Sequence, residues 1–250
     1  TALSAFSSLQ HRSIVLSLSV RMSSSDQSFD TWIQLLKNNR EWADKTKAEK
    51  PEYFTRLAEA QSPPFLYVGC ADSRLPLTSF TQTGPGQFFV QRNIANQIST
   101  TDINFLATLE YAVNVLKVQH IIVSGHYNCG GIKAAVTGVD SGIIGNWVQP
   151  IRRLYLKSKD QLEKLPEKEM LNQLSEMNVV HQIKNLMTTK CMMEKIFEGN
   201  VAPTVHGIVI DLSSGHMKEL PIPFDDWKAR SLLPPSFDNN QYKVGDKFLE

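Results

Sequence analysis

The chain has 250 residues, of which 42% are hydrophobic, and this is enough to bury the core of one α/β domain. Its 26 basic and 25 acidic side chains nearly cancel, which argues against a nucleic-acid groove or a polybasic membrane surface. We therefore expect a small or uncharged substrate, no nucleic-acid partner and no membrane partner. Three cysteines in a chain of this length cannot form a disulfide framework, so free or metal-bound thiols are expected.

Residues 1–25 are predicted to be a leader that lies outside the folded domain. The first 22 residues include Arg12 and Arg21, many serines and no acidic residue. This composition is typical of an amphipathic organelle transit peptide, and a mitochondrial location is the prediction. The alternatives are a chloroplast or cytoplasmic location, the latter with a disordered tail and a second start at Met22.

Residues 26–60 are predicted to form an N-terminal helical arm. Apolar side chains recur three and four residues apart over residues 28–50, which indicates one amphipathic helix. Pro51 can open a second short helix, because proline is tolerated in a first turn. The apolar stripe is larger than a lone arm can shelter, so we expect it to pack on a second subunit. Its members are Phe29, Trp32, Ile33, Leu35, Leu36 and Trp42.

Residues 61–223 are predicted to form the core, because strand-like and helix-like patterns alternate there. Strands are expected at residues 65–70, 87–91, 120–125 and 204–211, with a hairpin partner at 217–220. Helices are expected at residues 102–116, 131–136, 146–157 and 167–197. The alternation predicts an α/β fold whose mostly parallel central sheet is flanked by helices. Residues 224–250 are rich in proline and polar side chains and are expected to be an extended C-terminal segment outside the core.

A candidate metal site is formed by Cys70, His126 and Cys129. Cys70 ends the first predicted strand, and the other two residues directly follow the strand at 120–125. Ligands of open α/β sheets bind at the carboxyl ends of strands, so these side chains are expected to converge there. Cysteine and histidine suit zinc, and three protein ligands leave a fourth position for water, as in catalytic sites. One Zn²⁺ per subunit is therefore predicted; the alternative is a structural zinc in a non-catalytic binding module.

Two charged residues, Asp72 and Arg74, follow the first ligand within one turn. A carboxylate and a guanidinium at this spacing can form a bidentate pair beside the metal. The alternative is an ordinary capping aspartate with a solvated arginine.

The segments Cys70-Ala-Asp-Ser-Arg74 and Gly125-His-Tyr-Asn-Cys-Gly-Gly131 resemble the two metal motifs of β-class carbonic anhydrases. The resemblance extends from about residue 30 to about residue 223 and so covers the whole predicted core. Further matching segments are Gln61-Ser-Pro-Pro-Phe65, Phe89-Val-Gln-Arg-Asn-Ile-Ala-Asn96, Glu110-Tyr-Ala112 and Val205-His-Gly207.

This resemblance implies an enzyme that hydrates carbon dioxide reversibly to bicarbonate and a proton by means of zinc-bound hydroxide. It implies that Asp72 accepts a hydrogen bond from that hydroxide, and that Arg74 keeps Asp72 ionised and oriented. It also implies homodimers or multiples of dimers. The alternative is a hydrolase of carbon disulfide or carbonyl sulfide that uses the same zinc site.

Further residues match the family's substrate pocket. Phe89, Ile94 and Tyr111 match its apolar wall, and Gln61 matches a glutamine that can hydrogen-bond the substrate. Gly130 is also predicted to be a substrate-binding residue. For the aromatic and branched residues, packing in the core is the alternative.

Some members of the family close the zinc site with the aspartate and bind a non-catalytic bicarbonate on a tryptophan, an arginine and a tyrosine. Arg92 is present here, but Tyr67 and Ile210 occupy the other two positions. We therefore expect an open, water-ligated site and weak or absent inhibition by bicarbonate.

Overall fold

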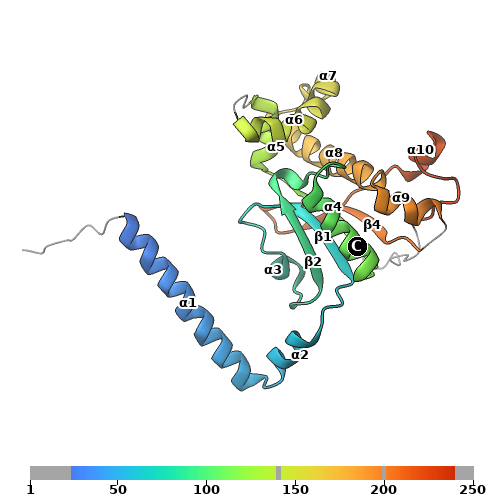
Figure 1. Cartoon of the computed structure of the whole chain (residues 1–250). Coiled ribbons are helices and arrows are strands. Elements are labelled where there is room, and N and C mark those ends of the chain that lie inside the picture. The colour runs from blue at the N-terminus through green and yellow to red at the C-terminus, as the bar shows by residue number, and fades with distance from the viewer. Residues whose placement is uncertain (1–23, 139–141, 199–200, 240–250) are drawn as a thin grey trace, which may run out of the picture. The chain divides into compact units, whose positions relative to one another are not determined.

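The structure, a computed structural model, describes residues 24–138, 142–198 and 201–239 (Figure 1). The predicted leader lies outside these residues except at its last two positions. Within the described part, every helix is too short or too polar to cross a lipid bilayer. The chain divides into two units, residues 1–58 and 59–250, which are described separately.

The first unit is helical, as the apolar stripe predicts. It contains α1 (Ser24–Glu49) and most of α2 (Tyr53–Glu59). On α1, the side chains of Trp32 and Trp42 are 55% and 50% exposed, so much of the apolar stripe faces outward within this unit. One edge-to-face contact, with ring centroids 5.4 Å apart, joins Trp42 to Phe54 of α2.

The second unit is built on one five-stranded sheet, with strand order β2-β1-β3-β4-β5. All pairings among the first four strands of this order are parallel, and β5 is antiparallel to β4. This confirms the predicted mostly parallel α/β fold and the hairpin partner at its edge. The strands are β1 (Phe65–Cys70), β2 (Phe88–Asn93), β3 (His120–His126), β4 (Thr204–Ile210) and β5 (Met217–Glu219).

Helices connect these strands, and local chemistry fixes several of their ends. Asp102 caps α4 by accepting a hydrogen bond from the backbone N–H of Asn104, and Gly138 ends α5 in a left-handed conformation. The helices are α3 (Leu77–Thr81), the 3-10 turn η1 (Ile94–Asn96), α4 (Ile103–Glu110), the π-helical turn η2 (Tyr111–Val115), α5 (Gly130–Thr137), α6 (Gly142–Lys157), α7 (Lys159–Leu162), α8 (Glu167–Met187), α9 (Lys190–Phe197) and α10 (Phe224–Ala229).

The main hydrophobic core lies on one face of the sheet. Apolar side chains of β1, β3 and β4 pack there against α4, α8 and α9, and they include Leu66, Val123 and Val209. A second buried cluster lies around the carboxyl ends of β1 and β4 and joins them to α5, α6 and the start of α8. Cys70 and Cys129 belong to this second cluster, so the candidate ligands sit in a packed, apolar surrounding.

The predicted single helix over residues 167–197 is wrong in its continuity, because α8 ends at Met187 and α9 begins at Lys190. The hydroxyl groups of Thr188 and Thr189 donate to the backbone carbonyls of Asn185 and Leu186. Threonine hydroxyls compete in this way with the backbone hydrogen bonds of a helix, and the two adjacent threonines end α8.

The prediction that residues 224–250 form an extended segment outside the core is also wrong in part. It forms α10, and Trp227 and Leu233 are 5% and 2% exposed in the main core. The side chain of Asn239 exchanges two hydrogen bonds, of 2.9 and 3.0 Å, with the backbone of Val205 at the start of β4. This part of the C-terminal segment is therefore an integral layer of the domain.

Candidate metal centre

Three strand-end side chains converge at the carboxyl edge of the sheet. Cys70 is the last residue of β1, His126 is the last residue of the neighbouring β3, and Cys129 directly precedes α5. All three are buried, and their ligand atoms lie within 4.8 Å of one another. The parallel register of β1 and β3 therefore creates the cluster that the sequence predicts.

The geometry of this cluster fits a tetrahedral zinc ion. The two sulfur atoms are 4.0 Å apart, and two thiolates at about 2.3 Å from a tetrahedral metal would be about 3.8 Å apart. The Nδ1 atom of His126 lies 2.9 Å from the backbone oxygen of Tyr127 and donates to it. Its Nε2 atom is buried without a hydrogen-bond partner and therefore presents a lone pair to the cluster.

The two thiols also have the electrostatics of a cation site. Hydrogen bonding from Cys129 lowers the pKa of Cys70 to about 4, whereas the thiolate of Cys70 and burial raise the pKa of Cys129. The pair therefore releases one proton readily and retains the second. A divalent cation between the sulfurs is what would allow both to ionise, and this donor set suits zinc.

Asp72 and Arg74 form the predicted bidentate pair beside the ligands. Arg74 donates from Nε to Oδ1 at 2.9 Å and from Nη2 to Oδ2 at 2.6 Å, and its backbone N–H also bonds Oδ1. These bonds hold the pKa of Asp72 well below its usual range. Oδ2 of Asp72 lies 3.8 Å from Nε2 of His126, so the carboxylate borders the candidate metal position.

Arg92 supports the backbone of the same loop. Its guanidinium donates to the carbonyl oxygens of Cys70, at 2.8 Å, and of Asp72, at 3.2 Å. Tyr67 and Ile210 are both 1% exposed. Arg92 is therefore engaged with backbone, and the other two positions of the family's bicarbonate site carry buried side chains.

The residues of the predicted apolar wall are partly exposed to solvent in the single chain. Phe89 and Tyr111 stack with ring centroids 5.7 Å apart, while Tyr111 and Ile94 are 44% and 41% exposed. Gly130, also exposed, is the first residue of α5, next to Cys129. Gln61 precedes the amino end of β1, whereas the ligands lie at the carboxyl ends. Within one chain, the length of β1 thus separates Gln61 from the cluster.

A close contact of Gly131 with the side chains of Ile94 and Ala95 links the predicted apolar wall to the metal loop. Ala95 has a left-handed φ of 60°, and the neighbouring Gly131 lies at the start of α5. A Cβ atom at Gly131 would lie 2.9 Å from the Cβ of Ala95 and 3.0 Å from Cγ2 of Ile94. Only glycine permits this approach without displacement of the wall.

Sequence reasoning missed a brace behind the histidine. The hydroxyl group of Tyr127 donates to Glu176 of α8, and Glu176 also forms a 2.9 Å ion pair with Lys218. The brace therefore fixes Tyr127, whose backbone oxygen orients His126. No local pattern indicates this contact, because its members are 49 residues apart in the chain.

A groove of about 760 Å³ opens beside the carboxylate–guanidinium pair. Arg74, Asn128 and Asp211 line it together with apolar side chains of α3 and α8. The groove gives the site a solvent-facing side, in contrast to the buried ligands.

A buried Cys-His-Cys cluster with an oriented carboxylate beside it, at the carboxyl edge of a parallel sheet, has the donor set and the position expected of a zinc site in a metalloenzyme. A family model described as carbonic anhydrase matches residues 65–217. A carbonic anhydrase of Emericella nidulans is 40% identical over 192 residues, which cover 76% of this chain and 84% of that protein. The chain therefore belongs to the carbonic anhydrase family, in its β class.

Solved structures agree with this assignment. The β-carbonic anhydrase CafA of Aspergillus fumigatus is 36% identical, with a TM-score of 0.74 over 81% of this chain and 97% of that chain. One of two tetrameric β-carbonic anhydrases of Sordaria macrospora is 38% identical, with a TM-score of 0.72 over 76% of this chain and 97% of that chain.

Proposed function

We propose that the chain is a zinc enzyme that catalyses the reversible hydration of carbon dioxide to bicarbonate and a proton. The observation that carries this proposal is the convergence of Cys70, His126 and Cys129, with the unpartnered Nε2 of His126 aimed into the cluster. One Zn²⁺ per subunit would be held by these three residues. Zinc, when bound, supplies an acidified water as the nucleophile.

Apart from the metal ligands, Asp72 is the side chain that we propose to be catalytic. Its Oδ2 atom accepts a hydrogen bond from the attacking water and thereby directs a lone pair of that water toward the carbon of the substrate. Because Arg74 keeps Asp72 ionised, the carboxylate orients the water without taking up its proton. The proton is then released to buffer, and the groove beside Arg74 offers a solvent-facing side for this release. Arg74 acts through Asp72 and is therefore a positioning residue.

The pocket for the substrate is proposed to include Phe89, Ile94, Tyr111 and the exposed start of α5 at Gly130. Carbon dioxide is apolar and uncharged, so an apolar wall next to the metal suits it. Gln61 would complete the site from a second subunit, because β1 separates it from the ligands of its own chain.

The purified zinc enzyme is expected to hydrate carbon dioxide much faster than it releases hydrogen sulfide from carbonyl sulfide or carbon disulfide. These linear molecules would meet the same nucleophile, but similar proteins such as the Emericella nidulans and Aspergillus fumigatus enzymes are carbonic anhydrases. Stopped-flow hydration and sulfide release, measured on one preparation, decide between the two activities. Faster sulfide release would overturn the proposal.

Bicarbonate is expected to act as an ordinary product inhibitor, with a Hill coefficient of about 1. The physical reason is that Arg92 already binds two backbone carbonyls and that Tyr67 and Ile210 are buried. Initial rates over a range of bicarbonate concentrations test this. Sigmoidal inhibition, or a crystal near neutral pH with Asp72 bound to zinc, would contradict the open site.

Homodimers or multiples of dimers are proposed, with α1 of one chain packed on another. The Trp32→Glu, Trp42→Glu double variant should form smaller particles than the wild type, because two half-exposed indoles would no longer be buried between subunits. Light scattering after size exclusion measures the mass, and Lys37→Glu on the same helix is the matched control. A monomeric wild type would refute this proposal.

A mitochondrial location is proposed from the composition of residues 1–25. Relatives from Arabidopsis thaliana include a mitochondrial and a chloroplastic β-carbonic anhydrase, 33% and 32% identical. Imaging of these 25 residues fused to a fluorescent protein distinguishes the two organelles from the cytoplasm.

A further inference from the structure

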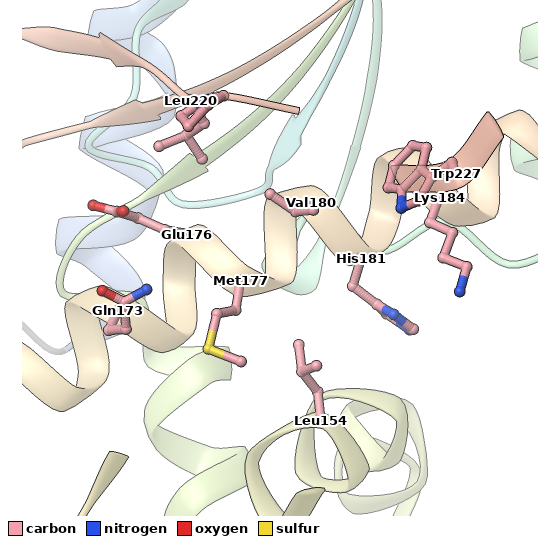
Figure 2. Close-up of a pocket in the computed structure, with 10 residues that line it drawn as sticks. Leu154, Gln173, Glu176, Met177, Val180, His181, Lys184, Leu220 and Trp227 are labelled. Atoms are coloured by element: carbon pink, nitrogen blue, oxygen red, sulfur yellow. The ribbon is translucent and has the colours of Figure 1, made fainter. Parts of the chain in front are cut away.

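A second cavity, of about 390 Å³, lies away from the metal centre between α6, α8 and the segment that follows β5 (Figure 2). Its floor is apolar and comes from all three elements, with Leu154 from α6, Met177 and Val180 from α8, and Leu220 and Trp227 from the C-terminal segment. Its volume lies within the range of about 300–1,000 Å³ that is usual for small-molecule sites. None of its lining residues is a candidate metal ligand; Glu176 alone among them also belongs to the brace behind His126.

One end of this cavity is cationic. Burial lowers the pKa of His181, and the positive charges of Lys184, Arg153 and Lys157, which are near enough to act on the imidazole, lower it further. Lys184 lines the cavity beside His181 (Figure 2), whereas Arg153 and Lys157 belong to α6 and are not among the lining residues. None of the three cations forms an ion pair with a residue that the structure describes. Like charges that have no ion-pair partner among the described residues repel one another, and a bound anion would relieve this repulsion.

The acidic residue at the opposite end of the cavity does not neutralise the cations near His181. Glu176 lies there with Gln173 (Figure 2), but it is already engaged with Lys218 and with the hydroxyl group of Tyr127. Along the cavity, the lining therefore changes from apolar side chains in the middle to Lys184 at the end near His181, and Lys184 has no ion-pair partner in the part of the chain that the structure describes.

This geometry points to a binding site for a monomeric amphipathic carboxylate, whose charged group lies between Lys184, Arg153 and Lys157 and whose hydrocarbon chain lies on Leu154, Met177 and Val180. A carboxylate alone would gain little from exposed lysines, and an alkyl chain alone would leave the cations unpaired. The two parts together match the two parts of the cavity. The site is independent of the proposed function, because it shares no residue with the metal cluster.

Titration calorimetry of the zinc-loaded enzyme with hexanoate, octanoate and decanoate tests the proposal. One saturable site is expected, with affinity that rises about two- to fourfold for each added methylene group. The Arg153→Gln, Lys184→Gln double variant should bind octanoate at least about tenfold more weakly. Leu154→Gln should remove the dependence on chain length. Lys190→Gln, at a side chain that is 90% exposed on α9, is the matched control and should bind as the wild type does.

Carbon dioxide hydration by every variant should equal that of the wild type. This control would show that each variant is folded and that the zinc site is not involved in octanoate binding. Three results would overturn the proposal: absence of saturable octanoate binding, unchanged affinity in the double variant, or affinity that does not depend on chain length. Association only with vesicles of anionic lipid would also overturn it, because the proposed ligand is a single molecule in solution.

Discussion

Replacement of Cys129 by serine is expected to remove bound zinc and to lower carbon dioxide hydration at least about 100-fold. A serine hydroxyl stays protonated at neutral pH and is a poor zinc ligand, so the cluster would keep only Cys70 and His126. Zinc content by plasma mass spectrometry, beside stopped-flow hydration, checks both consequences.

Cys191→Ser is the matched control for this experiment. Cys191 lies on α9 and is the third cysteine of the chain, half-buried and outside the cluster. Its variant should keep one zinc per subunit and full activity. If Cys129→Ser kept its zinc and its activity, the assignment of the metal centre would be wrong.

Asp72→Asn is expected to keep its zinc but to lose about two to four orders of magnitude in kcat. An amide places N–H donors where the carboxylate offers only acceptors, so it cannot both accept two bonds from Arg74 and accept one from the attacking water. The ligands themselves are unchanged, which separates loss of orientation from loss of metal.

This variant also decides between catalytic and purely structural zinc. A metal that only stabilises a binding module has no need of an oriented carboxylate, and Asp72→Asn would then behave like the wild type. Asp225→Asn is the control, because that side chain is 95% exposed in a surface ion pair with Lys228. Full activity of both variants would refute the proposed role of Asp72.

The sequence predicts the sheet and the metal cluster because both depend on local signals. Apolar runs bounded by proline or glycine mark the buried strands, and Cys70, His126 and Cys129 lie directly at strand ends. Parallel pairing then brings the ligands together without further information. The spacing of Asp72 and Arg74 likewise makes their ion pair a local event.

Very short helices, and contacts between residues far apart in the chain, could not be predicted from local sequence patterns. The five-residue α3 and the four-residue α7 are too short to show a helical period. Polar composition after Pro221 concealed α10, although Asp225 and Asp226 in its first turn are a usual helix-start signal. The brace from Tyr127 to Glu176 joins separate elements, and only the folded chain shows it.

The close approach of Gly131 to Ala95 and Ile94 has a consequence for redesign of substrate selectivity. Since Gly131 lies directly against the side chains of Ala95 and Ile94, the size of the proposed substrate pocket would be changed through the side chain at position 94. Any larger residue at position 131 would instead push the whole turn η1 and deform the coordination loop with it. Variants designed to admit bulkier molecules should therefore change Ile94 and keep Gly131.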